Sequence, residues 1–503
     1  MKNLLEIVQI LTKKKIAKIE ILDEQTLKNK DSKFGIFYEA LMTGKIASDQ
    51  EAAKILYGKP EAGNARYRQL KSRFKRRLYN TLFFLDVNAP LTSNRAQAQF
   101  NCNKEWALVE IMLTYDARTP AISLARQILT IALKFHFTHL VVKSAQLLRE
   151  QAVLDENEKL FEEYNAYVKQ FTPVLEIEIR AEELSQKAEL AYQTRFFEEK
   201  GLDHLEQIGN ELISLTEKTD SPQVHYHMYA VWVLYYELLQ AYEEILEVIQ
   251  KAKDYLRSNP DYFDEHRKSY FLIKKFAVYL HLQQYREGKA QAEELLSELQ
   301  PDSMEWFDFM EYYLLLSLHT ENMINALAVF NKVADSPGFK KLDEARREKW
   351  ELFEAFFHYF IEVEDLNPNL LLRQRRKAFK FSDFINQPVN YPAKYVTLTI
   401  HHTVLKILFL LFRRNYSAIP KLLEQLRKLS RYELTKDGYE RATAMVKLLY
   451  QLEKADFQMD KLKSVDRYLQ KLEDNRFFYR GKISELEVIP YHKLWQMLCR
   501  HLE

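Results

Sequence analysis

The chain of 503 residues has little glycine, proline or cysteine. It contains 10 glycines and 13 prolines, whereas an average protein of this length would have roughly 35 and 25, at about 7% and about 5%. Sandwiches, barrels and doubly wound sheets need glycine at turns with positive φ and at close backbone approaches. The composition therefore argues against these folds and predicts an all-α protein.

The 2 cysteines, Cys102 and Cys499, are too few and too far apart for a disulfide framework or a zinc site. We therefore expect a cytoplasmic protein. No apolar run approaches the ~20 residues that span a bilayer, and the most apolar run, residues 407–412, ends at two arginines. The apolar stretch within the first 15 residues is interrupted by Glu6, so we expect these residues to form an amphipathic helix. We therefore predict no membrane segment.

Charge is balanced overall but uneven along the chain. With 73 Lys plus Arg and 71 Asp plus Glu, the net charge is +2. Residues 1–100 are nevertheless strongly basic, and residues 151–220 are strongly acidic. Different parts of the molecule are thus expected to present different charges to partners, although biased surface helices would give the same pattern.

Residues 33–86 have the pattern of a compact helical module. Ser48 and Glu51 have the spacing of a capping box, and Gly58 can close the short helix that follows. A second helix is predicted over residues 64–86, where apolar residues recur every three or four positions. The turn-forming residues 90–94 are the best linker candidate, so we predict an N-terminal helical module over residues 1–90 and a helical array over residues 91–503.

Residues 271–301 carry the clearest repeat-like pattern. They resemble a tetratricopeptide repeat, in which bulky residues of one helix face small residues of the next. The matching residues are Leu272, Phe276, Tyr279, Tyr285, Gly288, Ala292 and Leu295. The resemblance implies that Tyr285, Gly288 and Ala292 are packing residues, and that Gly288 lies where the two helices of one repeat cross.

Weaker copies of this pattern align on the aromatic residue of the turn or on the residue that replaces it. These are Phe137, Leu202, Tyr242, Met323 and Tyr416. The steps between them are irregular, and the two longest could each hold two units. We therefore predict an α-solenoid of degenerate tetratricopeptide-like helix pairs. The alternative is a non-repetitive helical bundle.

The whole chain also resembles a little-described bacterial family of hypothetical tetratricopeptide-type proteins. The resemblance rests on residues 51–86, 401–419 and 484–495. It implies a helical-repeat protein and assigns no catalytic residue.

Motifs for catalysis, cofactors or metals are missing. Gly58 and Gly63 have the spacing of a phosphate-binding loop, but Asn64 and Ala65 replace the required lysine and hydroxyl residue. The pairs His136/His139 and His401/His402 have no metal-binding pattern. Adjacent acids, such as Glu182/Glu183 and Glu198/Glu199, are expected on a solvated helix face. We predict no catalytic residue, no metal site, no cofactor and no enzymatic activity.

One helix is strongly basic and indicates a possible nucleic-acid contact. Seven cations and no acid lie between positions 64 and 80, namely Arg66, Arg68, Lys71, Arg73, Lys75, Arg76 and Arg77. With the capped helix before it, this helix resembles the second helix of a helix-turn-helix, although the turn of seven residues is longer than usual. A second basic cluster comprises Arg373, Arg375, Arg376, Lys377 and Lys380, with Phe379 and Phe381 interleaved. Either cluster could instead cover an acidic protein surface.

Two functions follow from these patterns. The first is a non-enzymatic scaffold or adaptor whose helical-repeat groove binds a protein partner or peptide segment, with some of the 30 tyrosines lining the groove. The second is a nucleic-acid-binding regulator, in which the N-terminal module contacts DNA or RNA and the repeats sense a partner.

Overall fold

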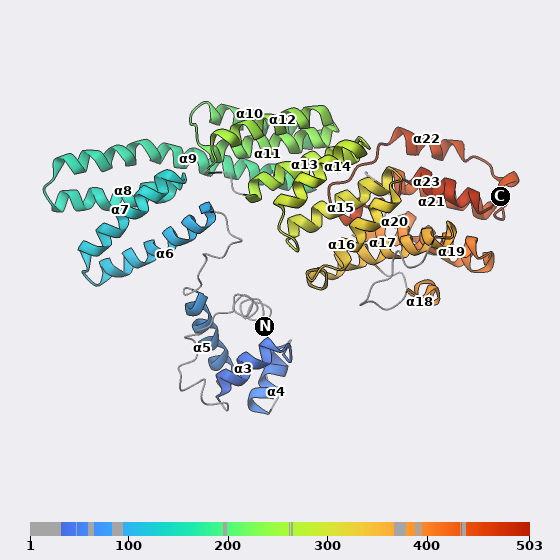
Figure 1. The fold of residues 1–503 in the computed structure, drawn as a ribbon, viewed down its shortest axis with the longest axis horizontal. Helices are drawn as coiled ribbons and strands as arrows, with labels where there is room; N and C mark the ends of the chain where they lie inside the picture. The colour runs from blue at the N-terminus through green and yellow to red at the C-terminus, as the bar shows by residue number, and fades with distance from the viewer. Residues whose placement is uncertain are drawn as a thin grey trace. The chain divides into compact units, whose positions relative to one another are not determined.

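The computed structural model describes residues 32–46, 48–58, 65–82, 94–194, 199–260, 262, 265–366, 379–387, 391, 395–432, 434 and 439–502. These residues contain 21 α-helices, α3 to α23, and no strand, which confirms the predicted all-α class (Figure 1). The chain divides into two units, Met1–Lys169 and Gln170–Glu503. The boundary predicted near residue 90 lies at positions 83–93, outside the described residues, and stays a prediction.

The first unit begins with three short helices around a small apolar core. They are α3 (Lys33–Met42), α4 (Asp49–Tyr57) and α5 (Ala65–Leu82). Ser48 caps α4 by accepting a hydrogen bond from the Glu51 amide, and the Glu51 carboxylate accepts one from the Ser48 amide, as predicted. Gly58 closes α4 in the left-handed conformation, with φ of 75°. The predicted helix over residues 64–86 corresponds to α5.

Three further helices of this unit pack in sequence order. They are α6 (Asn94–Thr114), α7 (Arg118–Lys134) and α8 (Thr138–Leu154). They are followed by α9 (Glu158–Thr194), a long helix that crosses the boundary between the units. Pro173 lies inside α9, and because proline has no amide hydrogen, the Lys169 carbonyl lacks its usual helical donor there.

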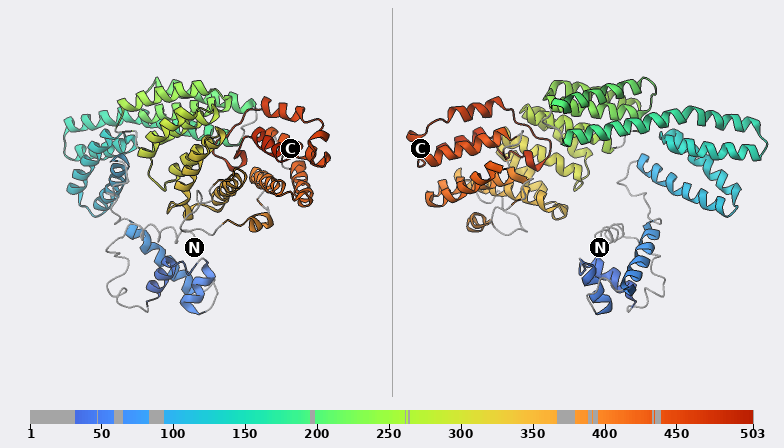
Figure 2. Two further views of the ribbon diagram at one scale, coloured as in Figure 1. Left: turned by 45° about the vertical axis from the view of Figure 1, so that its right-hand side comes forward. Right: turned by 180° about the vertical axis from the view of Figure 1, so that it is seen from behind.

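The second unit continues with helices that pack mostly on their neighbours in sequence (Figure 2). Its helices after α9 are α10 (Glu199–Thr216), α11 (Pro222–Leu239), α12 (Tyr242–Ser258), α13 (Glu265–His281), α14 (Tyr285–Glu298), α15 (Met304–His319), α16 (Met323–Ala334), α17 (Glu344–Val363), α18 (Phe381–Asn386), α19 (Val396–Phe412), α20 (Ile419–Tyr432), α21 (Glu440–Lys454), α22 (Asp466–Asp474) and α23 (Tyr491–Arg500). In addition, α13 contacts α15, α17 contacts α19, and α19 contacts α21. Alternate helices are therefore neighbours, which is consistent with a helical-repeat arrangement.

A recurring turn marks the helix pairs of this unit. Each of the first helices α11, α13, α15, α17, α19 and α21 is followed within two positions by a non-glycine residue with positive φ. These residues are Gln240, Gln283, Glu321, Asp365, Arg414 and Asp456. The steps between these residues are 43, 38, 44, 49 and 42 positions. The long interval between Met323 and Tyr416 thus contains a further turn, at Asp365. Of the residues that the repeat pattern places at turns, Tyr242, Tyr285 and Met323 begin second helices, and Phe137 directly precedes α8. Leu202 instead lies within α10, and Tyr416 begins a short 3-10 turn that precedes α20.

The pair α13–α14 corresponds to the tetratricopeptide-like segment of the sequence. Phe276, Ala292 and Leu295 are fully or almost fully buried, and Tyr285 packs against the same core. A Cβ atom at Gly288 would lie 2.4 Å from the Leu316 side chain of α15 and 3.4 Å from Cβ of Tyr279 on α13. The prediction that Gly288 faces the other helix of its own pair is therefore incomplete, because its closest neighbour belongs to the next pair.

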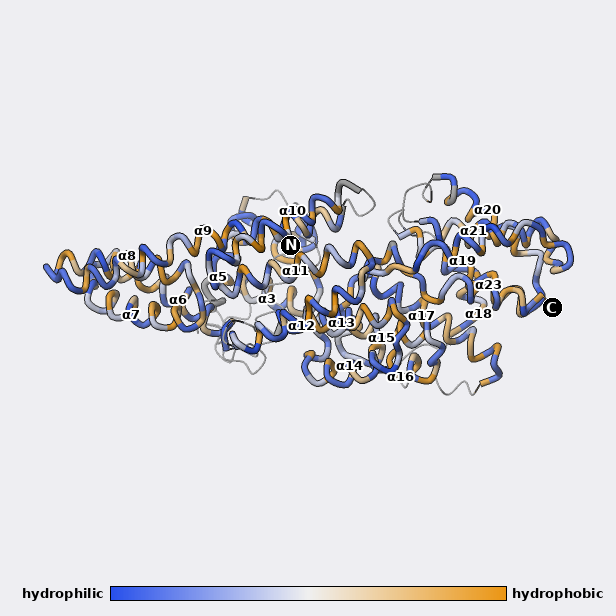
Figure 3. The backbone as a smooth tube through the Cα atoms, turned by 90° about the horizontal axis from the view of Figure 1, so that it is seen from above, coloured by the Kyte–Doolittle hydropathy of each residue, from blue (hydrophilic) through white to orange (hydrophobic). Residues whose placement is uncertain are grey.

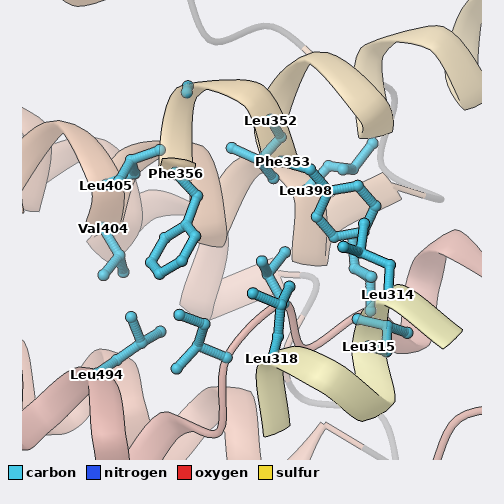
Figure 4. Close-up of a cluster of buried hydrophobic side chains, with 14 of the residues drawn as sticks. Leu314, Leu315, Leu318, Leu352, Phe353, Phe356, Leu398, Val404, Leu405 and Leu494 are labelled. Atoms are coloured by element: carbon cyan, nitrogen blue, oxygen red, sulfur yellow. The ribbon is translucent and has the colours of Figure 1, made fainter. Parts of the chain in front are cut away.

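The largest apolar core lies in this unit. Side chains of α15, α17, α19 and α23 meet there, including Leu318, Phe356, Leu405 and Leu494 (Figure 4). Most helices carry hydrophobic and hydrophilic residues in alternation (Figure 3), but α19 is buried at every position from 396 to 411. None of the described helices is both long enough and apolar enough to cross a bilayer.

Candidate functional surfaces

The N-terminal module fixes the orientation of the basic helix α5. Tyr67, Phe74 and Leu78 are buried on one side of α5, where Phe74 packs 4.7 Å from the ring of Phe37 on α3. The Asp49 carboxylate on α4 accepts hydrogen bonds from the Tyr67 hydroxyl and the Lys71 ammonium, both at 2.6 Å. Burial opposes ionisation of Asp49, but these two bonds outweigh it and lower its pKa.

The opposite side of α5 is a surface of arginines. At 100° per residue, Arg66, Arg68, Arg73 and Arg76 fall within an arc of about 160°, and Arg76 lies opposite the buried stripe. All four side chains are exposed. We call them the α5 arginine face.

The other three cations predicted for this site interact within the module. Lys71 forms the ion pair with Asp49, Lys75 lies 5.3 Å from the ring centre of Tyr79, and Arg77 lies 4.9 Å from that of Phe34. The structure thus places all seven cations on one helix but brings only four together on its outer face. In the second predicted cluster, Arg373, Arg375, Arg376 and Lys377 lie outside the described residues.

A segment without α-helix, residues 475–490, crosses the first helices of several pairs in the second unit and contains one short 3-10 turn, Ile483–Glu485. It connects α22 with α23 (Figure 1). The Tyr479 amide donates to Nε2 of His281 on α13, at 3.1 Å. Thr397 on α19 donates to the Ile483 carbonyl at 2.6 Å, and Arg480 donates to the Tyr192 carbonyl on α9 at 2.8 Å. We call residues 475–490 the crossing segment.

Buried polar groups hold the end of the crossing segment. Glu487 is 4% exposed and forms a two-point ion pair with Arg441 of α21, at 2.6 and 2.8 Å. Nε2 of His319 donates to the Glu487 carbonyl at 2.8 Å, and Nε2 of His401 donates to the Leu486 carbonyl at 2.9 Å. Burial lowers the pKa of both histidines to about 4, so both are neutral at pH 7.

Helices of several pairs therefore already carry residues of this chain on one face. The sequence predicted a groove formed by stacked helix pairs, but it did not predict the role of this segment. Two signals in the sequence mark it, namely the absence of a helical period between residues 475 and 490 and the presence of Gly481, which has φ of 83°. Nothing in the local pattern identifies the helices that the segment contacts.

Three residues of the histidine and carboxylate pairs singled out in the sequence, His401, His402 and Glu183, have structural partners, and Glu198 lies outside the described residues. His401 and His402 are 4% and 3% exposed, and Nδ1 of His402 lies 3.1 Å from the Tyr391 hydroxyl. Glu183 forms surface ion pairs with Arg180 and Lys187. Among the described residues, no group of three or more His, Cys, Asp or Glu side chains is arranged to hold a metal ion.

Compared with known proteins, the chain matches no protein-family model, no curated protein and no solved structure at a significant level. The comparisons name no family, and the structure itself supports an all-helical protein with sequential packing of helix pairs.

Proposed function

We propose that this chain is a non-enzymatic scaffold or adaptor whose tetratricopeptide-like helix pairs bind an extended segment of a partner protein. The crossing segment carries this proposal. Side chains of α13, α15 and α19 bind its main-chain amide and carbonyl groups. The first helices of the pairs thus have the side chains needed to bind an extended peptide.

The recurring turns support the tetratricopeptide-like part of the proposal. Helix pairs that repeat every 38 to 49 positions stack into an array, and each pair exposes surface that the next does not cover. The small residues Gly288 and Ala292 between bulky neighbours match the packing logic of such repeats.

Affinity capture combined with cross-linking tests this function. The full chain, immobilised in native lysate, is expected to retain a protein that cross-links to lysines on the helices of the second unit. Capture of nucleic acid alone, or cross-links confined to α3–α5, would contradict the proposal. Pre-incubation with free full-length chain is the control for specific capture.

A second candidate, a nucleic-acid-binding regulator, is favoured by the α5 arginine face. The Asp49–Lys71 ion pair anchors one side of α5 and leaves four exposed arginines on the other. Phosphate groups are natural partners for such a face. The two helices that resemble a helix-turn-helix are α4 and α5. Residues 59–64, which connect them, lie outside the described residues.

Salt-dependent binding to random-sequence duplex tests this second candidate. We expect Arg68→Gln, Arg73→Gln and Arg76→Gln together to weaken binding equally for all sequences and to flatten the log–log salt dependence by roughly one unit per lost contact. A matched control changes three exposed lysines of the second unit, Lys251, Lys340 and Lys421, to glutamine. No binding by the parent chain at low salt, where the electrostatic attraction is strongest, would exclude the candidate.

A further inference from the structure

Helix α6 is apolar on two opposite sides. It is the first of three helices, α6 to α8, that pack in sequence order (Figure 1). On one side of α6, which packs against α7, Cys102, Trp106 and Val109 are buried. On the other side, four large apolar side chains are between 37% and 80% exposed, namely Phe100, Leu108, Ile111 and Tyr115. We call these four residues the α6 stripe.

The α6 stripe is continuous along the helix. At 100° per residue its members fall within an arc of about 80°, whose centre lies about 170° from the centre of the buried side. At 1.5 Å per residue the stripe is about 22 Å long. The half-buried Lys104 lies within the arc, and the apolar stem of a lysine can extend along such a surface. The stripe is therefore one apolar surface rather than four isolated residues.

This surface is unusual for the first helix of an array. The terminal helices of a repeat array need a polar outer face, because no further repeat packs on them. The exposure of the α6 stripe shows that the described residues leave it largely uncovered. Single exposed apolar residues are common on protein surfaces, whereas a contiguous apolar patch marks an interaction site.

The size of the stripe indicates what can cover it. At roughly 200 Å² for each large side chain, the four residues expose on the order of 400 Å². Each partner of a stable dimer buries about 800 Å², so the stripe is too small to hold a second copy of the chain. Its length of about 22 Å equals that of a single helix of about 15 residues.

Residues 1–15, which lie outside the described residues, have this length and a matching pattern. The sequence predicts an amphipathic helix there. Leu4, Val8 and Leu11 have the spacing i, i+4 and i+7, which places them on one face of a helix. Lys2 and Lys13 fall on the opposite face and would remain in solvent.

The connections along the chain allow residues 1–15 to reach α6. Residues 83–93 join α5 to α6 and span at most about 40 Å, and residues 16–32 span up to about 55 Å when extended. A segment tethered in this way is present at an effective concentration in roughly the millimolar range. Modest affinity for the stripe is then sufficient for docking.

We propose that residues 1–15 form a helix that docks on the α6 stripe of the same chain. Leu4, Val8 and Leu11 contact the stripe, and the lysine-bearing face replaces it as the outer surface of the array. The docked helix thus covers the apolar end of the array and prevents a second array from stacking there. This inference does not depend on the proposed scaffold function.

Site-specific photo-cross-linking of the purified full chain tests the docking. With p-benzoylphenylalanine in place of Val8, we expect cross-links within one chain to residues 105–118, the tryptic peptide that contains Leu108, Ile111 and Tyr115. The matched control carries the photo-cross-linker in place of Gln9, which falls on the polar side of the same helix. Its yield on this peptide should be much lower.

A change in the stripe provides a second readout. Ile111→Glu places a carboxylate under the docked helix, so we expect about fivefold less cross-linking and about fivefold faster tryptic cleavage at Lys13. Because Ile111 is 53% exposed, the circular dichroism spectrum should match that of the parent. Asn103→Glu adds the same charge at an exposed position of α6 outside the stripe and should change neither measurement.

Several results would overturn the proposal. Cross-linked products of twice the chain mass would assign the stripe to a second copy. Cross-links from position 8 that reach only α3–α5, or that never reach residues 105–118, would place the segment elsewhere. Equal cross-linking and equal cleavage in Ile111→Glu and the parent would show that the stripe does not hold it.

Discussion

Residues in the left-handed conformation close many helices of this chain, and most of them are not glycine. Asp116, His136 and Glu156 end successive helices of the first unit with φ of 51° to 56°. In each case the next amide bonds to the carbonyl five positions earlier, as at Asn157 and Ala152, 2.9 Å apart. This is the hydrogen bond of a Schellman motif, in which glycine is usual because side chains disfavour positive φ. The shortage of glycine therefore does not mean that tight turns are absent.

Glycine at one of these positions should stabilise the protein. Glu156 is exposed, and its side chain makes no hydrogen bond or ion pair with the residues that the structure describes. Left-handed backbone costs a side-chain-bearing residue about 1–2 kcal/mol, whereas glycine loses about 0.5–1 kcal/mol through its freer unfolded chain. We expect Glu156→Gly to raise the free energy of unfolding by up to about 1 kcal/mol in urea titrations.

Glu156→Ala is the matched control, because it removes the same side chain but keeps the Cβ atom. This variant should not raise the free energy of unfolding. Equal stabilisation by alanine would show that charge, rather than backbone strain, is responsible.

At the level of helices, close approach between successive pairs depends on Gly288. Leu316, the nearest neighbour of a Cβ placed there, is fully buried and has little room to move. Gly288→Leu should therefore lower the free energy of unfolding by about 1–3 kcal/mol, as overpacking generally does. Chemical denaturation of the full chain measures this change.

Glu287→Leu introduces the same side chain at the adjacent exposed position and should change stability by no more than about 0.5 kcal/mol. Adding Leu316→Ala to Gly288→Leu should recover part of the loss. If the double variant is instead less stable than both single variants, the contact between α14 and α15 is not the cause.

At the level of the second unit, the crossing segment makes stability dependent on pH. The pKa values of His319 and His401 are lowered by burial from 6.5 to about 4. The unfolded chain therefore binds more protons than the folded chain between these values, so the stability that the two neutral histidines contribute is fully present above pH 6.5 and is lost as the pH falls toward 4. With 1.36 kcal/mol for each pKa unit, the loss approaches about 3 kcal/mol per histidine.

Urea midpoints measured between pH 7 and pH 4.5 test this dependence. His401→Gln keeps a donor for the Leu486 carbonyl but cannot gain a proton, so the fall should be smaller in this variant. His204→Gln, at a half-buried histidine of α10, is the control and should retain the parent slope. An identical slope in His401→Gln and the parent would mean that protonation of His401 does not contribute to the acid sensitivity.

Local patterns in the sequence were sufficient to predict the helices and much of the basic surface. The capping box at Ser48, the buried stripe of α5 and the packing residues of α13–α14 depend on residues within about 35 positions of one another, so their spacing predicts them. The seven cations of α5 were also evident. The sequence did not show which of these cations remain on the outer face. Lys71 pairs with Asp49, and Arg77 lies over the ring of Phe34, only once the module has folded.

The sequence by itself determined the helical class, because periodicity and turn composition are local properties. Tertiary structure decided the position of the crossing segment. Tyr479 bonds to His281 across 198 positions, and Leu486 bonds to His401 across 85. Such pairs leave no periodic signal, since each depends on the geometry of several packed helices. The rings of Tyr242, His281, Phe477 and His319 likewise lie against one another only when the last helices pack against the earlier ones.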